Sequence, residues 1–177
     1  MKAPQLQTNN PNIHLIEPDI ERDAQLGQQW LEGELGRNTL TLMGVSDEHN
    51  QATTLEREKE RVRDFIENAD QLNWMIQLNN KVVGSIWVDL KPKDKVPAPA
   101  VHIMIGDPNV RSKGVGGAST VAVIDFLRQQ GEAAVYSRTL VQNTIAKNLL
   151  YDNGFMPYGE SYTDEDGLEW QNAALHL

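Results

Sequence analysis

The sequence predicts an α/β fold in which a mixed, mostly antiparallel central sheet is flanked by helices. Two observations predict this class. Residues 73–90 contain two apolar runs of strand length joined by Asn79-Asn80, which is the pattern of a β-hairpin. Residues 100–130 then read as a strand, a Gly-rich turn and a helix with apolar residues at helical spacing.

The first elements along the chain are a short strand and a helix. Residues 13–16 form an apolar run of strand length. Asp19 is placed to cap a helix whose apolar residues recur at helical spacing, and Gly33 and Gly36 end it. Residues 39–45 are apolar but fit neither period, so their conformation stays open.

A second helix and the hairpin come next. Thr53 or Thr54 is placed to cap this helix, and several glutamates lie near its positive end. Its apolar stripe consists of Leu55, Val62, Phe65 and Ile66. The hairpin strands are expected over residues 73–78 and 81–90, with Asn79-Asn80 as the tight turn.

Strands and helices alternate in the second half of the chain. They are a strand over 100–105, a helix over about 116–130 that ends at Gly131, a strand over 133–139, a helix over 143–152, a strand over 155–162, a turn over 164–167 and a last strand over 168–175. No repeat or linker interrupts this order.

Composition bounds the class of protein. A chain of 177 residues, 40 % of them hydrophobic, suits one domain with a sizeable core. We expect a flexible segment over residues 1–11 and a single domain over residues 12–177. The chain has no cysteine, which excludes disulfides and thiolate chemistry. No apolar run spans a membrane and no signal peptide follows the polar start, so we expect a cytoplasmic protein with no membrane partner.

The charge of the chain points away from nucleic acid. The formal net charge is −9, whereas neutralising phosphates requires a basic face. This acidity suits a cationic amine substrate, or serves only solubility. The four histidines are scattered without ligand spacing, so no metal site is expected.

The Gly-rich turn, residues 107–118, is the most informative motif. It contains three glycines: Gly114, Gly116 and Gly117. Glycine lets backbone amides approach a ligand closely, and the amides at the start of the following helix lack partners and carry its positive end. Arg111 and Lys113 add cationic donors, so the turn predicts a diphosphate site. The alternative is a turn that only caps the helix.

This turn resembles a cofactor loop of a known superfamily. The pattern Arg111-x-x-Gly114-x-Gly116 is similar to the acetyl-CoA pyrophosphate loop of the GNAT (Gcn5-related N-acetyltransferase) superfamily. It is neither a Walker A loop nor the dinucleotide fingerprint, because the spacing of the glycines differs.

A second signature of the same superfamily follows in the expected order. Asn143 stands at a helix start, Ala146 is the small residue after it, and Gly154-Phe155 follows the helix end. The resemblance covers residues 81–175. It implies the GNAT fold, with acetyl-CoA bound by the end of the strand, the turn and this helix: Ile105, Gly106, Arg111, Ser112, Lys113, Gly114, Val115, Gly116, Gly117 and Asn143.

The implied reaction is N-acetyl transfer, which would make the protein an acyltransferase. Acetyl-CoA is then a co-substrate, and a primary amine attacks its thioester directly, without a covalent enzyme intermediate. A backbone amide near Ile105 or Gly106 is implied to polarise the thioester carbonyl. Two alternatives are a non-catalytic module that binds or senses acyl-CoA, and a phosphoryl-transfer enzyme, for which the Mg²⁺ carboxylates are missing.

The acid and the base of this reaction stay open. Many family members carry a tyrosine four residues before the glycine of the second signature, where this chain has Leu150. Tyr151 is the neighbour but is turned about 100° around the helix. His102, in mid-strand, is a candidate base because histidine titrates near neutral pH, and a carboxylate or a water chain is the alternative.

The sequence says least about the acceptor amine. With leucine at position 150, the chain resembles the branch of the superfamily that acetylates ribosomal-protein N-termini. A protein N-terminus is therefore the first expectation, and a small cationic amine is the second. Trp30 is the candidate to face the acceptor pocket, between residues 30–43 and 162–167. The acidic run Asp164-Glu165-Asp166 reads as a turn, or attracts a cationic substrate. The oligomeric state, including a homodimer, stays open.

Overall fold

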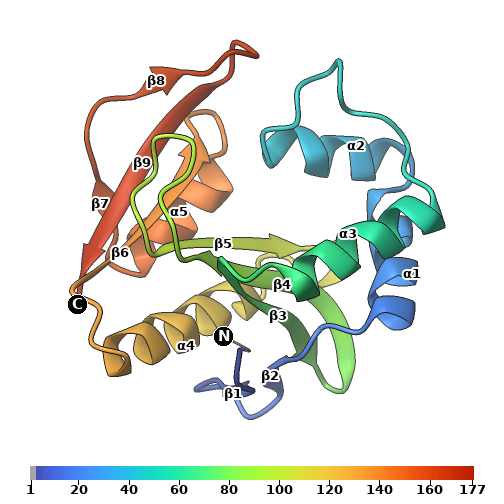
Figure 1. Ribbon diagram of the computed structural model, residues 1–177, viewed down its shortest axis with the longest axis horizontal. Helices are drawn as coiled ribbons and strands as arrows, with labels where there is room; N and C mark the ends of the chain where they lie inside the picture. Colours follow the sequence, from blue (N-terminus) through green and yellow to red (C-terminus); the bar gives the residue numbers. More distant parts are fainter. Residues whose placement is uncertain (1–2) are drawn as a thin grey trace.

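A single mixed sheet organises the computed structural model, which describes residues 3–177 (Figure 1). Within these residues the sheet has nine strands in the order β1-β2-β3-β4-β5-β6-β9-β7, and β8 pairs with β9. The strands are β1 (Leu6–Gln7), β2 (Ile13–Ile16), β3 (Gln71–Leu78), β4 (Lys81–Asp89), β5 (Ala100–Ile105), β6 (Ala134–Leu140), β7 (Met156–Pro157), β8 (Tyr162–Thr163) and β9 (Glu169–His176). Every pair is antiparallel except β5 with β6.

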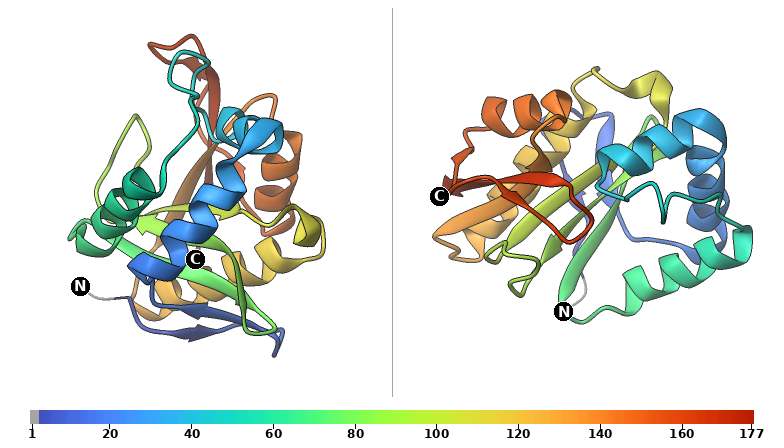
Figure 2. Two further views of the ribbon diagram at one scale, coloured as in Figure 1. Left: turned by 90° about the vertical axis from the view of Figure 1, so that its right-hand side faces the viewer. Right: turned by 90° about the horizontal axis from the view of Figure 1, so that it is seen from above.

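Five α-helices and one 3₁₀ turn surround the sheet. They are α1 (Ile20–Leu31), α2 (Gly33–Leu42), α3 (Leu55–Glu67), η1 (Pro108–Val110), α4 (Val115–Gln129) and α5 (Thr144–Asp152). Figure 2 shows that α1, α2 and α3 gather at one end of the molecule, whereas α5 lies with β9 at the other. The expected α/β class, with a mostly antiparallel sheet flanked by helices, is confirmed.

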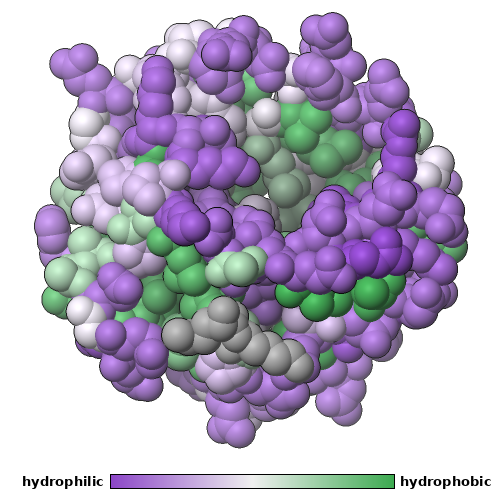
Figure 3. Space-filling view, in the orientation of Figure 1, coloured by the Kyte–Doolittle hydropathy of each residue, from purple (hydrophilic) through white to green (hydrophobic). Residues whose placement is uncertain are grey.

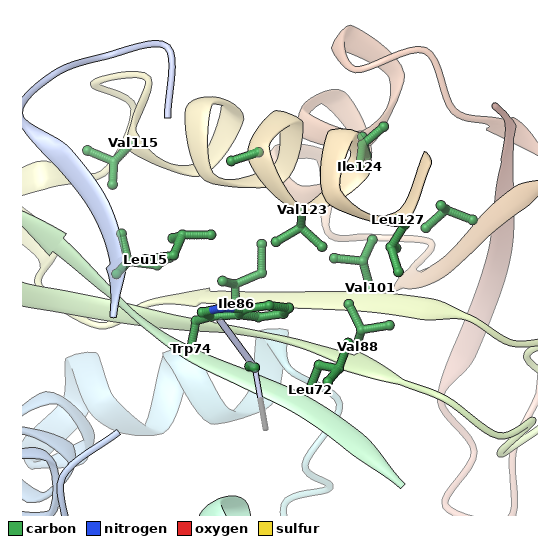
Figure 4. Packing of buried hydrophobic residues seen from close by; sticks show 14 of the residues in the cluster. Leu15, Leu72, Trp74, Ile86, Val88, Val101, Val115, Val123, Ile124 and Leu127 are labelled. Atoms are coloured by element: carbon green, nitrogen blue, oxygen red, sulfur yellow. The ribbon is translucent and has the colours of Figure 1, made fainter. Parts of the chain in front are cut away.

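The main core lies between α4 and one face of the sheet. Figure 4 shows Val123 and Leu127 of α4 pointing at Ile86 and Val101 of the central strands. The opposite face is covered by α3, where Phe65 packs edge-on against Trp87 of β4 at 6.0 Å between ring centroids. Because side chains alternate along a strand, every second residue of β4 and β5 faces α4, and the residues between them face the side covered by α3.

Most of the expected elements are confirmed, because their local signals agree with their packing. Asn79 and Asn80 both have left-handed φ angles, of 48° and 63°, as a tight hairpin turn requires. Thr54 rather than Thr53 caps α3, since its hydroxyl accepts from Arg57 N. Gly131, at φ 87°, follows the end of α4.

Several expectations differ from the structure. Gly36 does not end the first helix, because α1 ends at Leu31 and Gly36 lies inside α2. Residues 39–45, which fit neither period, belong largely to α2, which begins at Gly33. The strand expected over residues 155–162 is reduced to β7 and β8, with exposed turns between them. Gly159, at φ 70°, lies where a continuous strand would need extended backbone.

The N-terminal segment is more ordered than the expected loose end over residues 1–11. Met1 and Lys2 lie outside the described residues. From Ala3 onward the chain packs on the sheet: β1 pairs with β2, Ala3 is buried in the core, and Trp74 Nε1 donates to Pro4 O at 2.6 Å. The polar sequence of residues 1–11 gave no sign of these contacts, because the bond at Pro4 is made with a tryptophan 70 residues away.

Candidate active site

β5 and β6 separate at the centre of the sheet. They are paired in parallel only where Ala100 lies opposite Tyr136, next to the bond from Tyr136 N to Pro99 O at 2.9 Å. Ser137 Oγ donates to Val101 O at 2.7 Å and closes the point where they part. Beyond it, no pairing joins β5 to β6 in the described chain, so one edge of residues 102–105 is open.

The backbone alternation decides which amides face this open edge. Gly106 N and Asp107 N both donate to Val83 O of β4, at 2.9 and 3.0 Å. The neighbouring residue in an extended strand directs its N–H and C=O to the other side. Ile105 O accordingly accepts from Arg111 Nε at 3.0 Å, away from β4. Of the two amides expected to polarise a carbonyl, Ile105 N therefore faces the opening, whereas Gly106 N is engaged with β4.

The Gly-rich turn leads from this edge into α4. Ser112 and Gly114 have left-handed φ angles of 60° and 80°, which turn the backbone sharply before the helix. The first bond of α4 runs from Ala118 N to Gly114 O at 3.0 Å. The N–H groups of residues 115–117 thus have no acceptor inside the helix, and the first turn contains no acidic residue. This helix start suits an anion.

A side chain at Gly116 would point toward α5 and β5. A Cβ built on Gly116 would lie 3.4 Å from Leu149 Cδ2 and 3.7 Å from Ile103 Cδ1, which is close to ordinary contact. A Cβ on Gly114 would meet nothing within 4 Å. The residues present therefore fit a diphosphate-bearing cofactor that lies along the start of α4.

The cationic residues of the turn take different positions. Arg111 is half-buried, and its Nη2 donates to Thr39 Oγ1 of α2 at 2.9 Å, besides the bond from Nε to Ile105 O. Ser112 and Lys113 are exposed to solvent. The guanidinium thus links three segments, while the ammonium of Lys113 lies on the surface beside the anion site.

Asn143 begins α5 and also contacts α2. Its Oδ1 accepts from Ala146 N at 3.1 Å, which is the expected helix cap, and its Nδ2 donates to Leu42 O at 3.0 Å. Leu150 is buried in the core, whereas Tyr151 is 38 % exposed on the outer side of the helix. The helix register therefore places leucine, not tyrosine, toward the sheet.

His102 forms a pair with the half-buried carboxylate of Asp89 on the face of β5 opposite α4. Its ring stacks on Trp87 at 5.3 Å between centroids, and Nε2 lies 3.1 Å from Asp89 Oδ2. That distance is one of an ion pair, although the nitrogen is not aligned for a hydrogen bond. Gln71 Nε2 donates to Asp89 Oδ1 at 2.6 Å. Burial raises the pKa of Asp89, but His102 and Gln71 together hold it below its ordinary value.

Trp30 lies beside the start of the Gly-rich turn. A Cβ on Gly106 would come within 2.1 Å of Trp30 Cδ2, so the indole covers this glycine. Trp30 also lines a cavity of about 510 Å³ between α1 and the β3–β4 hairpin, with Lys81 and Asp107. Residues 162–167 do not line this cavity, so a pocket that they share with Trp30 stays a prediction.

A second wall is built around Trp170 of β9. A Cβ on Gly44, just after α2, would come within 2.2 Å of the Trp170 ring, and Arg138 lies over the ring at 4.1 Å. Asp164 Oδ2 accepts from Trp170 Nε1 at 2.7 Å, so this carboxylate is part of the turn. Figure 3 shows a hollow in this face between α2 and β9, with hydrophobic residues on the α2 side.

The remaining site expectations concern metals and membranes. Across residues 3–177, no cluster of three or more His, Asp or Glu side chains could hold a metal ion. None of the helices over the same residues has both the length and the hydropathy needed to cross a bilayer.

The comparisons with known proteins agree with this geometry. Residues 42–155 match the family described as Acetyltransferase (GNAT) family. A mycothiol acetyltransferase of Nocardia farcinica is 30 % identical over 78 residues, which are 44 % of this chain and 26 % of that protein. The chain thus spans about a quarter of that relative.

Two solved structures share the whole fold at low identity. The RimL ribosomal L7/L12 α-N-protein acetyltransferase in complex with coenzyme A superposes with a TM-score of 0.76 at 17 % identity, over 97 % of this chain and 98 % of that one. The microcin C7 self-immunity acetyltransferase MccE, in complex with acetyl-CoA and AMP, gives 0.75 at 14 % identity, over 95 % and 94 %. At such identity the likeness concerns the fold.

Sequence reasoning missed several residues of this site. Thr39 was in an unassigned segment, and Asp89 ended a strand without a motif. Ser137 sat in a strand whose neighbours were unknown. No local signal marked Asp89, because only the pairing of β4 with β5 brings it beside His102.

Proposed function

Because the chain belongs to the acetyltransferase (GNAT) family, we propose that it transfers an acetyl group from acetyl-CoA to a primary amine. One observation carries this proposal: the open edge of β5 leads directly into a left-handed turn at the start of α4. An extended thioester arm has backbone groups to pair with along that edge, and its diphosphate has amides at the helix start.

Cofactor binding is assigned to backbone more than to side chains. The diphosphate is held by the amides of the turn and of the first turn of α4, with Arg111 and Lys113 as cationic neighbours. Asn143, whose amide group has a second N–H, holds the arm. The full set is Ile105, Gly106, Arg111, Ser112, Lys113, Gly114, Val115, Gly116, Gly117 and Asn143, of which Gly106 has its N–H bonded to Val83 O.

The chemical step is direct attack. The amine nitrogen bonds to the thioester carbon, the carbon–sulfur bond breaks, and Ile105 N–H stabilises the developing oxyanion. His102 takes the amine proton at Nδ1, because its Nε2 lies beside Asp89 Oδ2. Leu150 supplies no proton, so the CoA thiolate takes one from solvent in this proposal.

The acceptor is assigned to the hollow between α2 and β9. A protein N-terminus is the first choice, supported by the fold shared with a ribosomal-protein N-acetyltransferase. A small cationic amine is the second choice, favoured by exposed carboxylates on the segments that flank the hollow: Asp47, Glu48, Glu165 and Asp166.

Two measurements test the proposal. Calorimetry with CoA tests the cofactor site, and a panel of peptides, polyamines and aminoglycosides with acetyl-CoA, monitored for free thiol, tests the reaction. Turnover of peptides alone would select the first acceptor. Absence of CoA binding by the folded protein would overturn the assignment of the turn.

A non-catalytic acyl-CoA sensor is the second candidate. The buried Leu150 favours it, since this position offers no proton to a leaving thiolate. Tight CoA binding without turnover of any amine in the panel would select this alternative.

A further inference from the structure

α2 is attached to both signature motifs of the cofactor site. Thr39, in its middle, accepts from Arg111 of the Gly-rich turn, and Leu42 O, at its end, accepts from Asn143 of α5. Neither α2 residue belongs to a motif. The two ties connect the helix that walls the hollow to the two segments that hold the cofactor.

The bond at Thr39 has a defined direction. The Thr39 side chain is buried, and its hydroxyl donates to Leu35 O at 2.9 Å within the helix. Its oxygen therefore accepts the Arg111 Nη2 proton. The same guanidinium donates to Ile105 O, so one side chain fixes both the end of β5 and the middle of α2.

α2 has little apolar packing to hold it otherwise. Its buried residues are Gly36 and Thr39 alone, and its first residue has no side-chain cap. Leu35 is 63 % and Leu42 39 % exposed. Segments with few buried apolar contacts open at low free energy, so the polar ties carry much of the helix's position.

Resting on the proposed function, we propose that Thr39 is a positioning residue that couples α2 to the bound cofactor. Arg111 has five N–H donors, of which Thr39 and Ile105 O use two. A diphosphate at the turn takes further donors and fixes the guanidinium in place. The hydrogen bond from Arg111 to Thr39 is then held more rigidly, and so is the bond from Asn143 to Leu42 O. Cofactor binding therefore reduces the mobility of α2, which walls the acceptor hollow. By linkage, a less mobile α2 raises the affinity for the cofactor.

Hydrogen exchange with and without CoA tests the coupling. CoA added to the wild-type protein is expected to slow amide exchange over residues 38–45. Thr39→Val, which keeps the shape but removes the acceptor, should abolish that slowing and weaken CoA binding about fivefold, the low end of typical coupling factors. Thr39→Ser, which keeps the hydroxyl, should restore both.

Thr41→Val is the matched control. Thr41 lies on the same helix, but its hydroxyl accepts from Asn50 and not from a cofactor motif. This variant should retain both the CoA affinity and the CoA-dependent slowing of exchange. A Thr39→Val loss no larger than the Thr41→Val loss would mean that Thr39 acts only through helix stability.

The outcomes separate this proposal from the proposed function. If CoA does not bind at all, the proposed function fails. If CoA binds but exchange over residues 38–45 stays unchanged or becomes faster, only the coupling fails. The wild-type measurement decides this point even if Thr39→Val does not fold.

Discussion

His102 Nε2 lies 3.1 Å from Asp89 Oδ2 across the end of the β4–β5 pair. The two side chains come from adjacent strands, and Trp87 covers the imidazole on one side. Asp89 and Trp87 thus flank the imidazole, and Nδ1 is the ring nitrogen that does not lie beside this carboxylate. We therefore propose Nδ1 as the atom that takes the amine proton.

His102→Asn is expected to slow acetyl transfer about a hundredfold, since a positioned base contributes roughly that much or more. The asparagine keeps a polar group beside Asp89, but its amide cannot take a proton from the amine near neutral pH. Single-turnover rates measure the effect, and calorimetry should show unchanged CoA affinity. A rate within threefold of the wild type would exclude His102 as the base.

The pair also predicts a pH dependence of stability. The pKa of Asp89 is lower in the folded protein than its ordinary value near 3.9. Its contribution to the free energy of unfolding is thus present above that ordinary value and disappears as pH falls through the folded-state pKa. Asp89→Asn should lower the urea midpoint at pH 7 and lessen its decline in acid. An equal decline in both proteins would contradict the assignment.

Gly116→Val should weaken CoA binding at least tenfold, about 1.4 kcal/mol. A first methyl at this position makes near-ordinary contact with Leu149 and Ile103, but a branched side chain extends beyond that contact, beside the helix start where the diphosphate is proposed to bind. Gly116→Ala is the matched control and should bind CoA within a few-fold of the wild type. Calorimetry on folded variants measures both, and equal affinities of Gly116→Val and the wild type would contradict a cofactor beside Gly116.

The parts of this site that could be predicted are those whose contacts join residues close together in the sequence. The Gly-rich turn and the cap at Asn143 were predictable, because both are local patterns of chain conformation. α2 was missed because its residues have weak helix signals and the helix is tied by distant side chains, as at Thr39 and Arg111. The parting of β5 from β6 depends on pairing across the sheet, which no local pattern encodes.

Trp30 shows the same difference between local signals and long-range contacts. Its spacing predicted a helix position, but its place over Gly106 required α1 to cross the end of β5. The structure places it at a cavity beside Lys81 and Asp107, and the acceptor pocket expected between Trp30 and residues 162–167 stays a prediction.

Gly106→Ala should destabilise the fold by about 1–3 kcal/mol, because its methyl would overlap the Trp30 ring. The indole is packed, so the strand end must shift, and the adjacent Ile105 amide shifts with it. Gly117→Ala is the control, since its methyl would meet only Asn153 Nδ2 at 4.0 Å. Urea midpoints measure the effect. Equal values for the two variants would show that the Trp30 ring moves aside without loss of folding stability.

Tyr151→Phe should leave the chemical step within about tenfold of the wild type, less than general acid catalysis usually contributes. The helix buries Leu150 in the core and leaves Tyr151 38 % exposed to solvent, so leucine rather than tyrosine takes the inward position. Single-turnover rates at saturating acetyl-CoA measure the step, with CoA affinity as the control for intact binding. Leu150→Tyr is the complementary variant, because it places a phenol where the superfamily carries one. A hundredfold loss in Tyr151→Phe would mean that α5 turns in the bound state to bring Tyr151 to the sulfur.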